Sequence, residues 1–192
     1  TSWLQGLPEE VVMCDVDRFV DRLYQPAIDK LGINHVIADW HRYVVDLNRL
    51  AGDVDEDSVR GHSNPSGSFT TGLLWVKTTT GIPLMKEPIS PQLHAQLVDK
   101  YFSPFHRQIE EHYKRFRAAG AKVIFHLDAH SMPSMGTAAH RDPGQKRAEI
   151  VVSDFNGKSC RSDFKDLVIS AYRQAGFEVA YNWPYVGGRL TQ

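Results

Sequence analysis

The sequence of 192 residues contains only two cysteines, Cys14 and Cys160, and they form no CxxC pair. Two cysteines are too few for a disulfide framework, so we expect free thiols and a reducing, cytoplasmic environment. The sequence also lacks a run of about 18 apolar residues, which a membrane-spanning helix requires. Its first ten residues have neither the basic start nor the apolar stretch of a signal peptide. We therefore expect no membrane partner.

An excess of charge of one sign is also missing. Lys and Arg number 22 against 23 Asp and Glu, which gives a formal net charge of −1. Because a nucleic-acid-binding surface needs a basic field, this balance predicts no nucleic-acid partner. The length is sufficient for one domain with a sizeable core, so we expect a single domain over residues 1–192. The lack of an initiator Met and of an evident terminal element suggests that this domain is truncated at both ends.

The helical pattern is clearest in three segments. Residues 15–31 repeat apolar side chains at i, i+3 and i+4, which predicts an amphipathic helix. Asp15 or Asp17 is the expected N-cap, Gly32 is expected to end the helix, and Pro26 to kink or break it.

The other two helices are predicted over 91–119 and 162–176. The first begins with Ser90 followed by Pro, an N-cap and first-turn pair, and is interrupted at Ser103 and Pro104. The second is expected to be a capped helix that ends at a glycine.

Short apolar segments between these helices predict strands. Strands alternating with helices indicate an α/β fold with a mixed, mostly parallel sheet and helices on both faces. Residues 52–72 and 132–147 are rich in polar, Gly and Pro residues and predict long loops, the first of them a functional lid or a disordered segment. The expected strands are 35–40, 42–50, 73–85 (a hairpin), 121–127, 149–155 and 177–184.

Polar side chains lie where several predicted strands end, the edge at which α/β proteins place their sites. Each also has an ordinary explanation: the aspartates as helix caps, Asn182 as a turn residue, Arg49 as a surface ion-pair partner and His130 as a hydrogen-bonded structural histidine. The candidates at this edge are Asp15, Asp17, Asp46, Asn48, Arg49, Asp128, His130, Asn182, Gly187 and Gly188.

A different metal site is conceivable within the sequence HLDAH. In a strand, alternation would place His126, Asp128 and His130 on one face, and these residue types bind zinc. In the opposing interpretation, His126 lies inside the sheet as a hydrogen-bonded core residue and the strand ends before His130.

Five short motifs, in this order and at these intervals, resemble the N-formylglutamate amidohydrolase family. They are DVDRFVDRLY, HRYVVDLNR, YFSPFHRQI, HLDAHSM and NWPYVGG. The resemblance spans nearly the whole chain. It implies an α/β fold like that of zinc carboxypeptidases and other zinc exopeptidases, within the broader phosphorylase/hydrolase-like group. It also implies hydrolysis of the formamide of N-formyl-L-glutamate to formate and glutamate, usually late in histidine degradation.

The same resemblance implies a divalent metal, most readily zinc, with three protein ligands and an open position for water. Asp17 and His130 match two of the ligands, with Asp15 as the fallback for the carboxylate. The third ligand, a histidine, should precede residue 1, and the catalytic carboxylate should follow residue 192.

The remaining matches imply roles around a small-molecule N-acyl amino acid. Asn48 and Arg49 resemble the pair that grips the substrate α-carboxylate, and Arg42 is the candidate for stabilising the oxyanion. Asn182, Gly187 and Gly188 match a ligand-facing segment in which glycines allow close backbone approach. His106, in SPFH, and Asp128 are expected to support the ligands through hydrogen bonds or packing.

Three alternatives remain open from the residues alone. The substrate could be another N-acyl amino acid or a small peptide. The chain could be a non-catalytic relative that binds a carboxylate through Arg49 and lacks a complete metal site. It could also be a plain α/β domain in which His130 is structural. The oligomeric state is not specified by the sequence.

Overall fold

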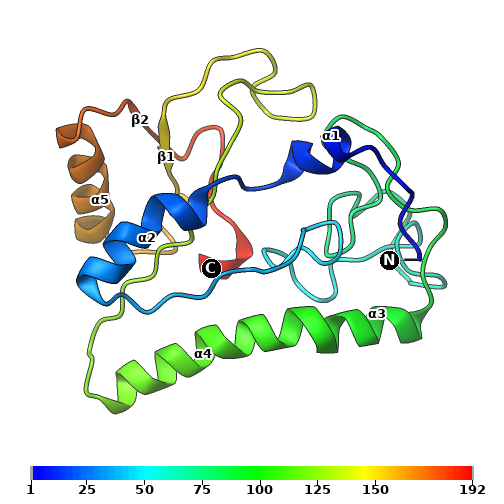
Figure 1. The fold of residues 1–192 in the computed structure, drawn as a ribbon, viewed down its shortest axis with the longest axis horizontal. Coiled ribbons are helices and arrows are strands. Elements are labelled where there is room, and N and C mark those ends of the chain that lie inside the picture. The colour runs from blue at the N-terminus through cyan, green and yellow to red at the C-terminus, as the bar shows by residue number, and fades with distance from the viewer. Residues whose placement is uncertain (1, 192) are drawn as a thin grey trace. The chain divides into compact units, whose positions relative to one another are not determined.

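The computed structural model describes residues 2–191, which contain helices and a small parallel sheet (Figure 1). The chain divides into two compact units: residues up to 124 together with 129–131, and residues 125–128 together with those from 132 onward. The single domain expected from the length stays a prediction.

The first unit begins with three helices near the amino end. They are α1 (Glu9–Val12), the 3₁₀ helix η1 (Met13–Asp15) and α2 (Val20–Leu31). Helix α2 ends at Gly32, as predicted, in a left-handed conformation with φ 61°. It begins later than predicted, and neither aspartate caps it: the N-cap is Phe19, at φ 62°, without a side-chain cap bond. Pro26 lies inside α2 and does not end it.

A long helix of the first unit consists of three consecutive parts. Helix α3 (Pro91–Leu97) continues through the π-helix η2 (Val98–Phe102) into α4 (Ser103–Ala118), as Figure 1 shows. Ser90 caps it as predicted, since its Oγ accepts from the amide of Leu93 at 3.1 Å. The interruption predicted at Pro104 takes the form of a wide turn. Because proline has no N–H to give to the preceding turn, a local π geometry accommodates it without ending the helix.

The apolar core of the first unit is built from segments predicted as strands. Tyr43, Trp75 and Leu84 form a buried cluster, although residues 42–50 and 73–85 contain turns and isolated bridges, not regular strands. The loop 52–72 is packed in its first part and is not a disordered segment, while its role as a functional lid stays a prediction. Its buried Asp55 accepts a hydrogen bond from the amide of Phe69 at 2.8 Å.

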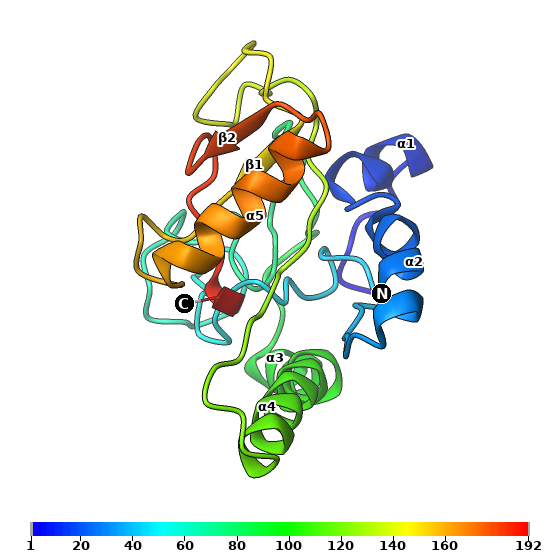
Figure 2. The ribbon, with the colours of Figure 1, turned by 90° about the vertical axis from the view of Figure 1, so that its left-hand side faces the viewer.

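The second unit contains a parallel β-α-β arrangement. Strand β1 (Ile150–Val152) pairs with β2 (Val179–Tyr181), as the sequence predicted, with Val151 opposite Ala180. Helix α5 (Ser162–Gln174) connects them and packs on both strands (Figure 2). The 3₁₀ helix η3 (Arg189–Thr191) follows. Helix α5 has no side-chain cap bond, contrary to expectation.

The larger sheet covered on both faces was a wrong prediction for residues 2–191, where the sheet has two strands. The segment 121–127 was expected to be a central buried strand. Its apolar side chains are instead partly exposed: Val123 by 44%, Phe125 by 61% and Leu127 by 58%. Apolar alternation indicates which side chains share a face, but a strand forms only where neighbouring backbones supply hydrogen-bond partners.

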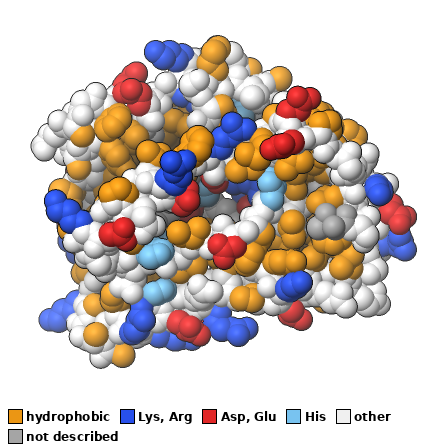
Figure 3. All heavy atoms as spheres, viewed as in Figure 1, with side chains coloured by type: hydrophobic (Ala, Val, Ile, Leu, Met, Phe, Trp, Pro, Cys, Tyr) orange, Lys and Arg blue, Asp and Glu red, His pale blue; other side chains and the backbone are white. Residues whose placement is uncertain are grey.

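The surface fits the balanced charge of the sequence. Figure 3 shows basic, acidic and hydrophobic side chains mixed over one face. Among residues 2–191, no helix is long and apolar enough to cross a membrane.

Candidate functional site

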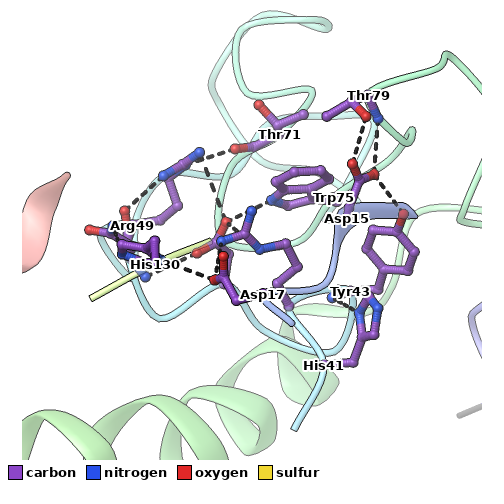
Figure 4. A network of polar contacts seen from close by, with 12 residues as sticks. Asp15, Asp17, His41, Tyr43, Arg49, Thr71, Trp75, Thr79 and His130 are labelled. Carbon is purple, nitrogen blue, oxygen red and sulfur yellow. Dashed lines mark hydrogen bonds and ion pairs between the residues drawn. The ribbon is translucent and has the colours of Figure 1, made fainter. Parts of the chain in front are cut away.

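The centre of the candidate site is a direct contact between Asp17 and His130 (Figure 4). His130 Nδ1 lies 3.0 Å from Asp17 Oδ2, and the next amide, that of Ser131, donates to Asp17 Oδ1 at 3.0 Å. The Ser131 hydroxyl in turn accepts from the amide of Arg18 at 2.7 Å. Two segments more than 110 residues apart are thus joined by three hydrogen bonds. Because Asp17 does not cap α2, its carboxylate can bind His130 and Ser131 instead.

The surroundings of Asp17 favour its anionic form. Burial raises the pKa of the Asp17 carboxyl, but the hydrogen bond and charge of His130, the Arg42 guanidinium and the Ser131 amide outweigh burial and lower it. Arg42 Nη2 lies 3.5 Å from Asp17 Oδ2. The other ring nitrogen, His130 Nε2, lies 3.3 Å from the side-chain amide nitrogen of Asn48, Nδ2. In the Asp17–His130 contact, the carboxylate therefore lies beside the Arg42 guanidinium and the imidazole beside the Asn48 side-chain amide.

Arg42 and Arg49 flank a buried carboxylate, Asp46. Asp46 is 2% exposed and accepts from the indole N–H of Trp75 at 2.9 Å and from the Asn48 amide at 3.0 Å. Arg42 Nε and Arg49 Nη2 lie 4.0 and 3.9 Å from Asp46 Oδ2. The guanidinium of Arg42 also stacks over the Trp75 ring, 5.3 Å from its centroid. Asp46 thereby holds both cations beside the Asp17–His130 contact.

Arg49 is oriented by backbone carbonyls. Its Nε donates to the carbonyl of Thr71 and its Nη1 to that of Asn48, each at 2.9 Å (Figure 4). A guanidinium carries five N–H groups, so these two bonds fix its plane and leave donors for an anion. The side chain is 32% exposed, so such an anion could reach it.

Asp15 has a structural role in this arrangement. It accepts hydrogen bonds from the Tyr43 hydroxyl at 2.6 Å and from both the hydroxyl and the amide of Thr79 (Figure 4). Burial, followed by the hydrogen bond and charge of Asp15, raises the pKa of Tyr43, so the phenol stays protonated as a donor. Asp17 is therefore the better placed of the two carboxylates to meet His130.

His106 supports the site from helix α4. Its Nε2 donates to the carbonyl of Leu47 at 3.0 Å, next to Asn48, and its ring packs on Phe102 and Phe105. Burial lowers the pKa of His106 against the opposing effect of this hydrogen bond, which favours a neutral ring.

The other predicted residues belong to the second unit. Asn182, at φ 53°, donates from Nδ2 to Asp154 Oδ1 at 2.9 Å and accepts from the Asp154 amide at 3.0 Å. Gly187 has φ 117°, a backbone conformation that other residues rarely adopt, and a Cβ there would lie 3.4 Å from the nitrogen of Phe155, an ordinary contact distance. Asp128 and Gly188 are also in this unit. The ligand-facing role of these residues stays a prediction.

Sequence reasoning missed several residues of the network. Trp75, Tyr43 and Thr79 were placed in strands, and Asp46 was named without a role. No local signal marked Trp75, because an indole N–H needs an acceptor only once it is buried and its acceptor, Asp46, lies 29 residues away in the sequence.

The residues 2–191 contain no group of three His, Cys, Asp or Glu side chains that could hold a metal ion. The three-residue site suggested by HLDAH was therefore a wrong alternative. Asp17 and His130 remain as a pair. Two ligands of one tetrahedral zinc ion are about 3.3 Å apart when each lies 2.0–2.1 Å from the metal. The 3.0 Å between Asp17 Oδ2 and His130 Nδ1 is close to that spacing.

Comparisons with known proteins agree with this fold and with the sequence resemblance. The chain superimposes on the crystal structure of N-formylglutamate amidohydrolase from Ralstonia eutropha JMP134 with a TM-score of 0.81 and 24% identity, over 97% of this chain and 68% of that one. It therefore has the fold of that protein. The family model described as N-formylglutamate amidohydrolase matches residues 4–192. The chain belongs to the N-formylglutamate amidohydrolase family.

Two relatives carry the name N-formylglutamate deformylase. The one from Pseudomonas putida is 29% identical over 191 residues, and the one from Pseudomonas aeruginosa is 30% identical over 201 residues. Each alignment covers 97% of this chain and 66% of the relative. The chain thus spans slightly less than two thirds of the length of the curated relatives it matches.

Proposed function

We propose that the protein hydrolyses the formamide bond of N-formyl-L-glutamate and releases formate and glutamate. The observation that carries this proposal is the 3.0 Å contact between Asp17 and His130 beside the Arg42 guanidinium, in a chain of this family. The names of the two Pseudomonas relatives, N-formylglutamate deformylase, support the same substrate.

Asp17 and His130 are our proposed protein ligands for a divalent metal, most readily zinc. A carboxylate held anionic and an imidazole at nearly the spacing of two zinc ligands fit such an ion. When bound, the ion would supply Lewis acidity to the formyl carbonyl and lower the pKa of water. The amide of Ser131, which donates to Asp17 Oδ1, would orient the carboxylate.

We assign different parts of the substrate to the neighbouring residues: the formyl group to Arg42 and the α-carboxylate to Asn48 and Arg49. Arg42 lies beside Asp17 and is held by Asp46, so its N–H groups can stabilise negative charge that develops on the formyl oxygen during attack by water. Asn48 and Arg49 would bind the α-carboxylate through charge-assisted hydrogen bonds. The fixed plane of Arg49 lowers the entropy cost of that binding.

The second candidate function is a non-catalytic domain that binds a carboxylate through Arg49. It is favoured by one observation: residues 2–191 supply a pair of ligands at this site and no group of three. This alternative predicts binding of the substrate without a bound metal and without formate release.

Formate release from N-formyl-L-glutamate by the natural protein, as its gene encodes it, tests the proposal. We expect turnover by the natural protein and a fall of at least about 100-fold in kcat/KM for His130→Gln, the scale of losing a catalytic electrostatic group. Arg60→Gln, at an exposed ion pair with Glu87, is the control and should retain activity. Binding of the substrate without any formate would overturn the proposal in favour of the non-catalytic domain. N-acetyl-L-glutamate and short formyl peptides, assayed in parallel, would show whether a related N-acyl amino acid is preferred.

Three wider assignments accompany the proposal. We place the protein in the cytoplasm, because its two cysteines are free thiols in the structure. We also propose a late step of histidine degradation as its setting and a zinc-exopeptidase-like group for its fold, both of which rest on the family.

A further inference from the structure

Two imidazoles of the long helix bind the backbone on either side of Asn48 and Arg49. His106 Nε2 lies 3.0 Å from the carbonyl oxygen of Leu47, and His94 Nε2 lies 3.1 Å from that of Ala51. Because a carbonyl can only accept, both rings donate through Nε2–H. The three residues between these two carbonyls include the pair proposed to bind the substrate carboxylate.

The geometry of the helix explains how both rings reach one segment. His94 and His106 are 12 residues apart, which in a regular α-helix is about three and a third turns and directs side chains about 120° apart. The π-helix η2 (Val98–Phe102) lies between them and accommodates one additional residue in its turn. The remaining spacing corresponds to about 11 α-helical residues, close to three full turns. The wide turn thus brings the two imidazoles onto the same face.

Two further hydrogen bonds hold the same segment. The amide of Leu50 donates to Asp53 Oδ2 at 2.9 Å, and the Arg49 side chain donates to the Thr71 carbonyl. Burial lowers the pKa of His94, as it does that of His106, so both rings act as neutral donors. The backbone of 47–51 is consequently fixed at both ends and in the middle.

We propose that His94 and His106, aligned by η2, are positioning residues that clamp Leu47–Ala51 and thereby preorganise Asn48 and Arg49 for the substrate carboxylate. The substrate part of this inference rests on the proposed function. Neither imidazole needs to touch the substrate: each acts through a carbonyl next to the binding pair. Preorganisation of this kind lowers the cost of binding, so its loss should raise KM more than it lowers kcat.

Matched substitutions can separate the donated hydrogen bond from the volume of the ring. Gln carries an N–H at a position similar to His Nε2, whereas Leu fills the space without a donor. We expect His94→Leu and His106→Leu each to raise KM about five- to tenfold with kcat changed less than about twofold, the scale of one hydrogen bond. The Gln variants should return KM to within about twofold of the natural protein. Deletion of Lys100 should convert η2 into a regular α-helical turn and leave the two rings 11 residues apart, still close to three full turns, so KM should stay within about twofold of the natural protein.

Hydrogen exchange of the amides in 48–52 provides a measurement that does not depend on activity. We expect these amides to exchange faster in the Leu variants and at the rate of the natural protein in the Gln variants. Exchange rates in the rest of the chain should not change. If the natural protein releases no formate but exchange follows this pattern, the proposed function fails while the clamp stands. If exchange in 48–52 is the same in all variants, or if Gln fails to restore it, the clamp is refuted even where formate release is normal.

Discussion

Asp46 shows at the scale of one residue how the candidate site is organised. It is buried, and hydrogen bonds from the Trp75 indole and the Asn48 amide fix its carboxylate. Its negative charge attracts the guanidinium groups of Arg42 and Arg49. Arg42 also lies beside Asp17, and Arg49 also donates a hydrogen bond to the carbonyl of Thr71. A single buried carboxylate therefore attracts both guanidinium groups, and the carbonyls of Thr71 and Asn48 fix the plane of Arg49.

Replacement of Asp46 by Asn should destabilise the protein and displace both arginines. One carboxylate oxygen becomes an NH₂ group, which would face a donor wherever it points, so a buried donor loses its partner at a cost of about 2 kcal/mol. The free energy of unfolding in urea measures this loss. Asp39→Asn, at an exposed position, is the matched control and should change it by less than about 0.5 kcal/mol. Equal stability of both variants would show that the Asp46 network contributes nothing.

Arg49→Lys tests the proposed binding of the substrate carboxylate. Lysine keeps the charge but cannot maintain the planar fork that the carbonyls of Thr71 and Asn48 orient. We expect KM for N-formyl-L-glutamate to rise about 10- to 100-fold, the scale of a hydrogen bond to a charged group, while kcat falls much less. Steady-state formate release measures both constants, with Arg60→Lys as the exposed control. An unchanged KM would remove Arg49 from substrate binding.

Single residues were partly predictable from the sequence. The motifs pointed to Asp17, Arg42, Asn48, Arg49, His106 and His130, and the structure places all six in the first unit. The hydrogen bonds from Trp75 to Asp46 and from Tyr43 to Asp15 span 29 and 28 residues. Their partners depend on how the chain folds over these distances, so no local pattern could have indicated them.

At the scale of elements, a polar cluster joins the strands of the second unit. Asp154, just after β1, accepts from Tyr181 at the end of β2, from Asn182 Nδ2 and from the amide of Gly157. Burial raises the pKa of Asp154, but the hydrogen bonds from Asn182, Gly157 and Tyr181 and the charge of Lys165 outweigh it, and the pKa is lowered from 3.8. The anionic carboxylate thus links the ends of both strands.

The lowered pKa predicts how stability depends on pH. A group whose pKa is lower in the folded state stabilises the fold above its unfolded pKa and loses that contribution as the pH falls through its folded pKa. The natural protein should therefore be more stable than Asp154→Asn by a constant amount from about pH 8 to pH 5, and the difference should shrink below about pH 4. Urea unfolding at a series of pH values measures it. A difference that grew as the pH fell would contradict the assigned direction.

Elements were predictable where the signal was local. The long helix was located from Ser90 and its apolar periodicity, and α5, β1 and β2 were found close to their expected ranges. The helix at 15–31 was placed correctly at its end but not at its start, because Asp17 bonds to distant His130 and Ser131. Strands at 35–40, 42–50 and 121–127 were wrong because strand formation depends on pairing with distant backbone, which alternation does not report. The hairpin predicted at 73–85 is confirmed as a short one, since Lys77 pairs antiparallel with Pro83 and the amide of Leu84 donates to the carbonyl of Val76 at 2.8 Å.

For the whole molecule, the family places the chain among proteins that are longer than it is. The alignments include 97% of this chain, but only 66% of the Pseudomonas relatives and 68% of the Ralstonia structure. The described residues bring together an anionic carboxylate, an imidazole and two guanidinium groups within the first unit. The proposed hydrolysis therefore depends on whether Asp17 and His130 hold a metal ion in the natural protein.

Metal content is the measurement that tests this most directly, by elemental analysis of the natural protein beside Asp17→Asn and Asp15→Asn after dialysis against buffered zinc. Circular dichroism would verify that each variant is folded. We predict one zinc per chain in the natural protein and in Asp15→Asn, whose carboxylate binds Tyr43 and Thr79, and strongly reduced zinc in Asp17→Asn. Zinc retained in full by folded Asp17→Asn, or no zinc in the natural protein, would contradict the account.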